Sequence, residues 1–279
     1  MRDRAAMRRL IINADDFGLD VAVNDAVERA HVDGVLTTAS LMVGAPAAAD
    51  AVARARRLPT LGVGLHLVLA DGPAVLPKRE IPDLVDDHGR FGDRMARDGF
   101  RFFFLPQVRR QLEREIRAQF EAFSATGLRL DHVNAHKHFH LHPTVLGLLL
   151  DIGREHGLRA VRLPREPGTA PLLKPWLALM QRRLHRAGVR HNDRIHGLAA
   201  SGAMDEMAVL RAIETLPDGL TELYLHPATH RGLTPTMPTY RHDDELAALL
   251  SPRVRAAITA RGAVLGRWVD FERTAASAR

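Results

Sequence analysis

The chain has 279 residues, which is enough for one large α/β domain or at most two small ones. Its 46% hydrophobic and 26% charged residues are ordinary for a soluble globular protein, and the absence of Cys excludes disulfides, a Cys-ligated zinc site and a thiol nucleophile. The formal net charge of +6 suits an anionic partner, but no Lys/Arg run or aromatic RNA-binding motif accompanies it, so we expect no nucleic acid.

The sequence shows no targeting or membrane-spanning segment. Residues 1–16 lack an apolar core of signal-peptide length, and no stretch approaches the ~20 apolar residues of a membrane span. We therefore expect a cytoplasmic protein that would touch a membrane only from its surface. The oligomeric state stays open, with a homodimer as one alternative.

Short apolar strands and helices alternate along the first part of the chain. Strands are predicted at 9–13, 37–43 and 61–69, and helices at 23–30 and 46–58. A regular order of strand and then helix is typical of a parallel sheet with helical crossovers. The first strand stops at Asp15 and Asp16, which we expect in a loop.

Residues 71–106 interrupt this alternation with several Pro and Gly residues and end in the aromatic cluster GFRFFFLP. We interpret the stretch as an insertion above a barrel mouth, forming a lid or a wall of the substrate site. If the cluster is extended, Phe102 and Phe104 face one way and Phe103 the other. At least one of these aromatic side chains should then be exposed.

The rest of the chain resumes the alternation with longer helices. Helices are predicted at 108–126, 143–156, 205–215, 243–250 and 252–261, and a long helix or a helical hairpin at 171–190. Strands are predicted at 160–163, 221–225 and 263–271, and residues 192–203 are expected to be irregular with one strand as an alternative at 195–198. Six or seven βα units predict an α/β protein with one distorted or incomplete (β/α) barrel over residues 1–279.

Histidines are concentrated in the segment 130–143, which reads LDHVNAHKHFHLHP. If the segment is extended, its histidines share one face and its apolar residues share the other. Pro143 then begins a helix, so the cluster lies where a strand runs into a loop. In β/α proteins that end of a strand carries the active site. A polar turn or a fortuitous tag-like run is the alternative, but the interleaved apolar residues favour a metal site.

Other residues able to bind a metal stand inside or directly after predicted strands: Asp15, Asp16, His66 and His226. A barrel brings strand ends onto one rim, so these side chains can meet the histidine cluster. Adjacent carboxylates are costly at the end of an apolar strand unless a cation or hydrogen bonds stabilise them. One Asp and two His would suit a divalent ion. Helix capping by the Asp pair and a core position for His66 are the structural alternatives.

These residues could together carry out metal-assisted hydrolysis, which needs a Lewis acid, a base and an acid for the leaving group. One of the two adjacent Asp residues can bind the metal while the other acts as base. His226, arriving from the opposite side, can act as acid. Arg162, at another strand end, could keep the base ionised, although a solvated Arg explains it equally well.

Five motifs in fixed order resemble one protein family: NADDFG (13–18), GLHLVL (64–69), DHVNAHKHFH (131–140), VRLP (161–164) and ELYLHP (222–227). They closely resemble the YdjC-like carbohydrate deacetylases, which look like relatives of the NodB-type polysaccharide deacetylases. Within that family the stretches RFFFLPQVRRQL and RHNDRIHGLAASGAM look most like the hopanoid-biosynthesis-associated (HpnK-type) deacetylases. The resemblance covers nearly the whole chain.

The resemblance implies that acetate is removed from an N-acetylated amino sugar. It implies that Asp16, His66 and His136 bind one divalent ion, Mg²⁺ or Zn²⁺, with Asp15 as base and His226 as acid. The implied substrate is the glycolipid N-acetylglucosaminyl bacteriohopanetetrol. A deacetylase of soluble chito-oligosaccharides, a metal-dependent phosphoesterase and a non-catalytic binding protein remain alternatives.

Two segments predict contact with the lipid part of such a substrate or with the inner face of an anionic membrane. Residues 100–104 combine four Phe with Arg101, and residues 171–190 combine Trp176 with several Arg. Burial of both segments in the core is the alternative. Substrate contacts are expected from Phe103 and from His138.

Overall fold

The computed structural model describes residues 7–168, 170 and 173–271. The strands in this part of the chain are β1 (Arg8–Phe17), β2 (Thr38–Leu41), β3 (Gly62–Leu67), β4 (Leu130–Ala135), β5 (Arg194–His196), β6 (Gly219–Leu225) and β7 (Val264–Leu265). The α-helices are α1 (Val21–Val32), α2 (Ala48–Arg57), α3 (Met95–Phe104), α4 (Pro106–Ala125), α5 (Pro143–Glu155), α6 (Lys174–Arg186), α7 (Glu206–Glu214), α8 (His242–Leu250) and α9 (Pro252–Ala260). The described residues also form the 3₁₀ helices η1 (His136–Leu141) and η3 (Val269–Phe271).

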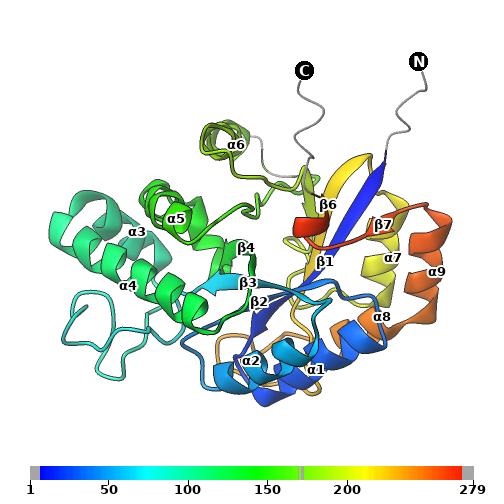
Figure 1. Cartoon of the computed structure of the whole chain (residues 1–279), viewed down its shortest axis with the longest axis horizontal. Helices are drawn as coiled ribbons and strands as arrows, with labels where there is room; N and C mark the ends of the chain where they lie inside the picture. The colour runs from blue at the N-terminus through cyan, green and yellow to red at the C-terminus, as the bar shows by residue number, and fades with distance from the viewer. Residues whose placement is uncertain (1–6, 169, 171–172, 272–279) are drawn as a thin grey trace.

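The strands form one parallel sheet in the order β4-β3-β2-β1-β6-β5, and β7 pairs with the beginning of β1. The sheet curls, and its helices lie on the outside (Figure 1). This arrangement confirms the predicted incomplete barrel. All the paired strands run parallel to one another. Their C-terminal ends therefore lie at the same rim of the barrel.

The two edges of the sheet meet at a seam that is only partly hydrogen-bonded. A continuous strand was expected at 160–163, but the structure has isolated parallel bridges from Val161 to β4 and from Ala160 to Arg190. Further along, the side chain of Asn192 accepts from the Leu163 N–H and donates to the Leu163 carbonyl. At this point a side-chain amide replaces backbone hydrogen bonds between strands. The two edges of the sheet are therefore connected, but no continuous strand closes the barrel.

Alternation along β1 divides the protein into an apolar outside layer and a partly polar interior. Leu10, Ile12 and Ala14 belong to the large core shared with the surrounding helices. On the inner face, Ile11 packs with Trp268, whose ring stacks 5.9 Å from that of His132. The barrel is therefore closed by apolar groups at the N-terminal ends of its strands, and polar side chains fill the opposite end.

Several elements differ from the sequence-based expectations. Strand β1 continues through the Asp pair to Phe17, where a loop was expected. Strand β4 ends at Ala135 and a 3₁₀ helix follows, so the histidines of 130–143 do not share one strand face. The aromatic cluster is the helix α3 rather than an extended segment. The predicted last strand is reduced to β7, and Pro171, where a helix was expected to begin, lies outside the described residues.

The segment between β3 and α3 packs along α4. Glu115 of α4 accepts hydrogen bonds from the backbone N–H groups of Val75 and Leu76, both at 2.9 Å. The segment is linked to the rim by Asp71, whose carboxylate lies 2.6 Å from Lys137 Nζ. Its role as a lid stays a prediction. Among the described residues, no helix combines the length and apolar character needed to cross a membrane.

Candidate metal and active site

Three predicted metal ligands lie together at the rim, on β1, β3 and the start of η1. Asp16 Oδ1 is 3.2 Å from His66 Nε2 and 3.1 Å from His136 Nδ1, and the two nitrogens are 3.3 Å apart. All three residues are buried. Ligands about 2.1 Å from one ion are separated by roughly 3.0–3.4 Å in octahedral or tetrahedral geometry. The three atoms therefore fit one divalent ion.

A bulge in β1 turns both carboxylates toward the interior. Neighbouring residues of a regular strand point to opposite faces. Here the pairing of β1 with β2 shifts register between Ala14 and Phe17, and Asp16 has a φ of 63°, in the left-handed region that non-glycine residues rarely adopt. Asp15 and Asp16 can therefore both serve the same site, at the cost of local backbone strain.

Among Asp16, His66 and His136, two buried side-chain atoms have no hydrogen-bond partner in the described part of the chain: Asp16 Oδ2 and His136 Nε2. Unpaired buried polar atoms are rare because they lose their hydration without compensation. Burial by itself would raise the pKa of Asp16, but His136 and His66 hold it well below the usual range. An ionised carboxylate with a free buried oxygen suits a bound cation.

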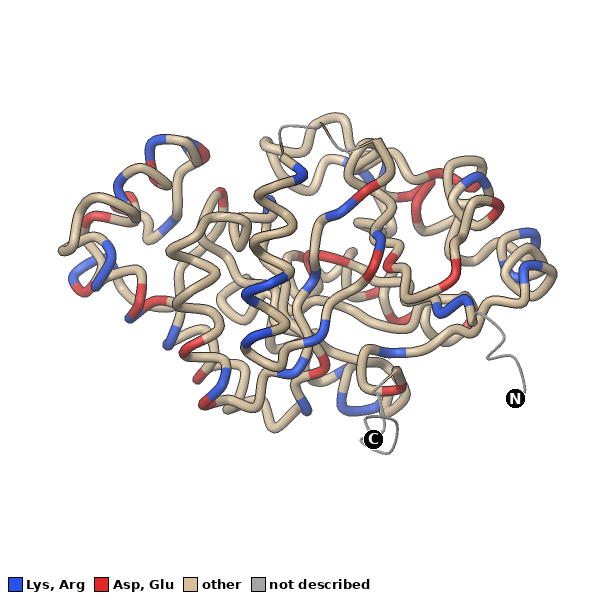
Figure 2. The backbone as a smooth tube through the Cα atoms, turned by 90° about the horizontal axis from the view of Figure 1, so that it is seen from above, with Lys and Arg blue, Asp and Glu red and all other residues tan. Residues whose placement is uncertain are grey.

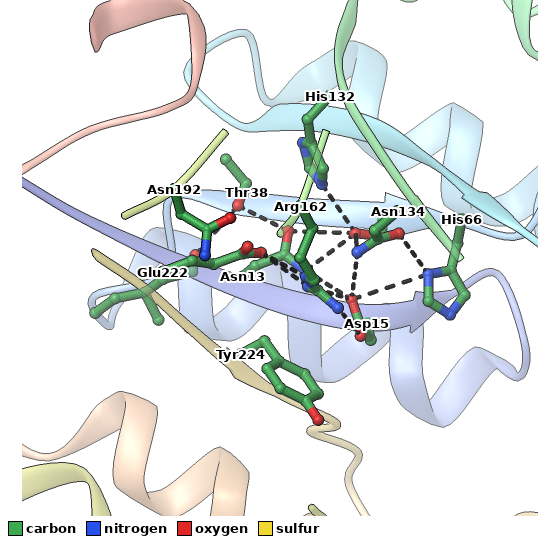
Figure 3. Close-up of polar contacts among 12 residues, drawn as sticks. Asn13, Asp15, Thr38, His66, His132, Asn134, Arg162, Asn192, Glu222 and Tyr224 are labelled. Carbon is green, nitrogen blue, oxygen red and sulfur yellow. Dashed lines mark hydrogen bonds and ion pairs between the residues drawn. The ribbon is translucent and has the colours of Figure 1, made fainter. Parts of the chain in front are cut away.

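Asp15 faces a different set of partners. Arg162 donates to both of its carboxylate oxygens, at 2.6 and 2.9 Å, and also donates to Glu222 at 2.8 and 3.0 Å (Figure 3). The guanidinium lies 4.5 Å from the centre of the Tyr224 ring. Burial would raise the pKa of Asp15, but Arg162 outweighs it and holds that pKa below the usual range. Asp15 is thus ionised at neutral pH, as a base must be.

His226 follows β6 and lines the same cleft as Asp15, His66 and His136. Its ring lies 5.1 Å from that of Tyr240, and the buried Glu245 accepts a hydrogen bond from its backbone N–H. Burial lowers the pKa of His226, although Asp16 and Asp15 oppose this. His226 is consequently uncharged at neutral pH. Tyr240 and Glu245 were not singled out in the sequence because they follow no strand and belong to no motif.

Known proteins identify the family. A family model described as "YdjC-like protein" matches residues 9–260. The chain belongs to the YdjC-like family. Over 268 residues it is 32% identical to a carbohydrate deacetylase of Geobacillus stearothermophilus, covering 95% of this chain and 98% of the relative. A chitooligosaccharide deacetylase of Serratia marcescens is also 32% identical, with 94% and 98% covered.

A solved structure resembles the YdjC-like chain over its full length. It is a protein of Enterococcus faecalis provisionally described as a cellobiose-phosphate cleavage protein, with 28% identity and a TM-score of 0.78. The match covers 96% of this chain and 100% of that one. The predicted membership of the YdjC-like family is thereby confirmed, while the HpnK type stays a prediction.

Two neighbouring cavities open at the rim of this YdjC-like barrel. The smaller, of about 150 Å³, is the polar cleft of the site and is lined by Asp15, His66, His136 and His226 among others. The larger, of about 410 Å³, is almost wholly apolar. Both cavities have His138 and Leu198 in their walls. A ligand could therefore extend from one into the other.

His138 contacts the cleft through an unusual turn. It and Lys137 both have left-handed backbone angles, with φ of 54° and 52°. The turn brings His138 Nε2 to 3.2 Å from the Tyr224 hydroxyl. Phe103, by contrast, lies on the exposed face of α3 and is not among the residues that line either cavity. Its predicted substrate contact would need an extended substrate.

Two further histidines of the cluster, His132 and His140, form hydrogen bonds within the protein. His132 bonds Asp131 and Ser40, at 3.1 and 3.0 Å, beneath the site. His140 donates to the Arg162 carbonyl at 3.0 Å, and burial together with the Arg162 charge lowers its pKa to about 3. It therefore stays neutral and braces the backbone of Arg162.

Proposed function

We propose that this protein removes the acetyl group from an N-acetylated amino sugar in a metal-dependent hydrolysis, releasing acetate and the free amine. The observation that carries the proposal is the grouping of Asp16, His66 and His136 beside the separately held carboxylate of Asp15. Full-length relatives that are carbohydrate and chitooligosaccharide deacetylases support it.

Asp16, His66 and His136 would hold the ion, Mg²⁺ or Zn²⁺, which when bound polarises the amide carbonyl and lowers the pKa of water. Asp15 accepts the proton of the attacking water, and Arg162 keeps Asp15 ionised and oriented for this. His226 donates a proton to the departing amine. Because burial keeps His226 uncharged, it has to take up a proton during the reaction. The net source is the attacking water, whose proton Asp15 accepts, so both residues return to their starting states.

We further propose that the amino sugar is carried on a hopanoid lipid, as N-acetylglucosaminyl bacteriohopanetetrol. The resemblance to HpnK-type sequences suggests this substrate, and the apolar cavity supports it. Leu141, Trp176 and Leu177 form part of its wall, next to the polar cleft. Ligand sites of this size are mostly apolar with a few polar groups that fix orientation. A sugar joined to a hydrocarbon body would match such a pair of cavities.

A peripheral contact with the inner face of an anionic membrane is part of this proposal. On α3, Phe100, Phe103 and Phe104 are exposed, and Leu173 and Leu179 are exposed at α6. Between positions 166 and 193 the sequence has five Lys and Arg and no Asp or Glu. Elsewhere basic and acidic positions are interspersed along much of the backbone (Figure 2). Exposed apolar residues beside basic ones favour an anionic lipid surface.

The products of hydrolysis distinguish this proposal from its alternatives. The Serratia relative favours a soluble chito-oligosaccharide as substrate, and the Enterococcus protein's description keeps phosphate ester cleavage as an alternative. Acetate and phosphate would be measured with an N-acetylglucosaminyl lipid, with N,N′-diacetylchitobiose and with a sugar phosphate. We expect acetate release, fastest from the lipid. Phosphate release without acetate would refute the proposal.

A further inference from the structure

Asn134 lies between the proposed base and one of the proposed metal ligands. It is a buried residue of β4 and is paired in register with His66 on β3. Its Oδ1 is 2.7 Å from His66 Nδ1, and its Nδ2 is 3.0 Å from Asp15 Oδ1 and 2.9 Å from Ser40 Oγ. Figure 3 shows the amide bridging the two residues. One side chain thus contacts both parts of the site.

The hydrogen bonds leave the amide only one orientation. Both oxygens of Asp15 accept hydrogen bonds from Arg162, so Asp15 is a carboxylate and can only accept from Asn134. The NH₂ group of Asn134 must therefore face Asp15, which turns its carbonyl oxygen toward His66.

The amide in turn fixes the protonation of the His66 ring. A carbonyl oxygen only accepts, so His66 Nδ1 must carry the hydrogen. In the neutral ring Nε2 then has the free lone pair, and it points at Asp16 and His136, at 3.2 and 3.3 Å. Asp15 cannot replace the amide, because its Oδ1 lies 3.9 Å from His66 Nδ1, beyond hydrogen-bond distance.

We propose that Asn134 is a positioning residue that couples the base to the metal site: Asp15 sets the orientation of the amide, and the amide holds His66 in the tautomer that can bind a metal. Histidine ligands generally donate their second N–H to a carboxylate, a backbone carbonyl or water. In this protein a side-chain amide takes that place and also contacts the base. The inference rests on the proposed function in taking His66 as a ligand.

Substitutions at Asn134 and at Asn13 separate this role from simple packing. Asn13 is a matched control, because it is equally buried and donates to Asp15 Oδ1 at 2.8 Å and to Ser40 at 3.0 Å but forms no hydrogen bond with His66. Zn²⁺ affinity would be measured by calorimetry on chelator-stripped protein, with acetate release and thermal unfolding measured in parallel. Metal affinity is a readout that does not depend on turnover.

Asn134→Ala should weaken Zn²⁺ binding by about 10–100-fold, whereas Asn13→Ala should change it by less than about threefold. Asn134→Asp should restore most of the affinity, because a carboxylate also accepts from His66 Nδ1. It should still not restore acetate release, because it places a second carboxylate against Asp15. Equal losses of affinity in the two Ala variants, or no recovery with Asp, would overturn the coupling.

A measurement on the wild-type protein covers the case in which a variant fails to fold. The ¹⁵N chemical shifts of the imidazole ring report which ring nitrogen carries a hydrogen. The His66 signals would be assigned by their absence in the His66→Gln variant. We expect Nδ1 to carry a hydrogen with and without Zn²⁺, and a metal-free ring protonated at Nε2 alone would overturn the inference. Zn²⁺ binding without acetate release would refute the proposed function and leave the coupling intact.

Discussion

Arg162 donates to both carboxylate oxygens of Asp15, at 2.6 and 2.9 Å, where neither side chain reaches solvent to any extent. The same guanidinium donates to the buried Glu222. A planar, bidentate pair of this kind fixes the direction of the carboxylate as well as its charge. Asp15 is therefore held as an oriented carboxylate, as its proposed role as base requires.

The first prediction concerns the shape of this pair. Arg162→Lys keeps the charge but cannot form two parallel bonds, so acetate release should fall about 100-fold or more. Arg162→Ala leaves two buried carboxylates unpaired and should lower the free energy of unfolding by about 3–5 kcal/mol. Steady-state rates and urea unfolding measure the two effects. Arg165→Lys, at a half-buried position bonded to Gln181, is the control and should change neither.

The second prediction separates the two adjacent carboxylates. Asp15→Asn should lower acetate release by about 10²–10⁴-fold with Zn²⁺ binding retained, because a base is removed and no ligand is lost. Asp16→Asn should lose the metal as well. Metal content of the purified variants, measured by mass spectrometry, decides between the roles. If Asp15→Asn lost its metal while Asp16→Asn kept it, the two assignments would be reversed.

Much of the site could be predicted from the sequence because parallel strands of a barrel end at one rim. Asp16, His66 and His136 lie far apart in the chain, yet each follows or ends a recognisable strand. Strand prediction alone was therefore enough to bring the three segments to one rim, whereas the choice of these three residues came from the family resemblance. The family motifs then supplied the expected roles, which sequence periodicity by itself left open.

Other features could not be predicted because they depend on packing. The alternation of 130–143 looks like a strand, but the chain turns at Lys137 and His138 into left-handed angles that no residue type there signals. The β-bulge at Asp16 could not be predicted either, because an Asp residue does not by itself indicate a left-handed backbone angle. Asn134 and Glu245 acquire their roles from side chains that only the folded barrel brings into contact.

The third prediction concerns pH. Burial raises the pKa of Glu245 from an ordinary value of 4.5 to about 7, although backbone N–H groups of His226 and Met204 oppose this. A raised carboxyl pKa stabilises the fold below about pH 4.5, and this contribution is lost as the pH rises through about 7. The rise of about 2.5 pH units sets a ceiling of about 3 kcal/mol.

Glu245→Gln cannot titrate and should remove that part of the pH dependence. Between pH 5 and pH 8 the wild type should lose more unfolding free energy than the variant does, by up to this ceiling. Urea unfolding of both proteins at the two pH values tests the difference. The substitution also alters hydrogen bonds, but a change in unfolding free energy that is the same at both pH values cancels when the two pH values are subtracted. Parallel pH profiles would show that Glu245 does not titrate in this range.

The fourth prediction concerns the membrane contact. Phe103→Ala should weaken flotation with anionic vesicles, because an exposed aromatic ring is removed beside basic residues. High salt should weaken binding by the wild type as well. Val32→Ala removes an equally exposed apolar side chain from α1 and should have no effect. Absence of wild-type binding to anionic vesicles at low salt would leave only a soluble-substrate role.

Acetate release before and after metal removal tests the central claim most directly. Purified wild-type protein would be treated with a chelator, desalted and assayed on an N-acetylated amino sugar with no metal, with Zn²⁺ and with Mg²⁺. His136→Ala would be assayed in parallel. We predict that release stops on chelation, returns with one of the ions in the wild type, and does not return in His136→Ala. Undiminished acetate release from the chelated wild type, or full recovery in His136→Ala, would contradict a metal-dependent deacetylase built on Asp16, His66 and His136.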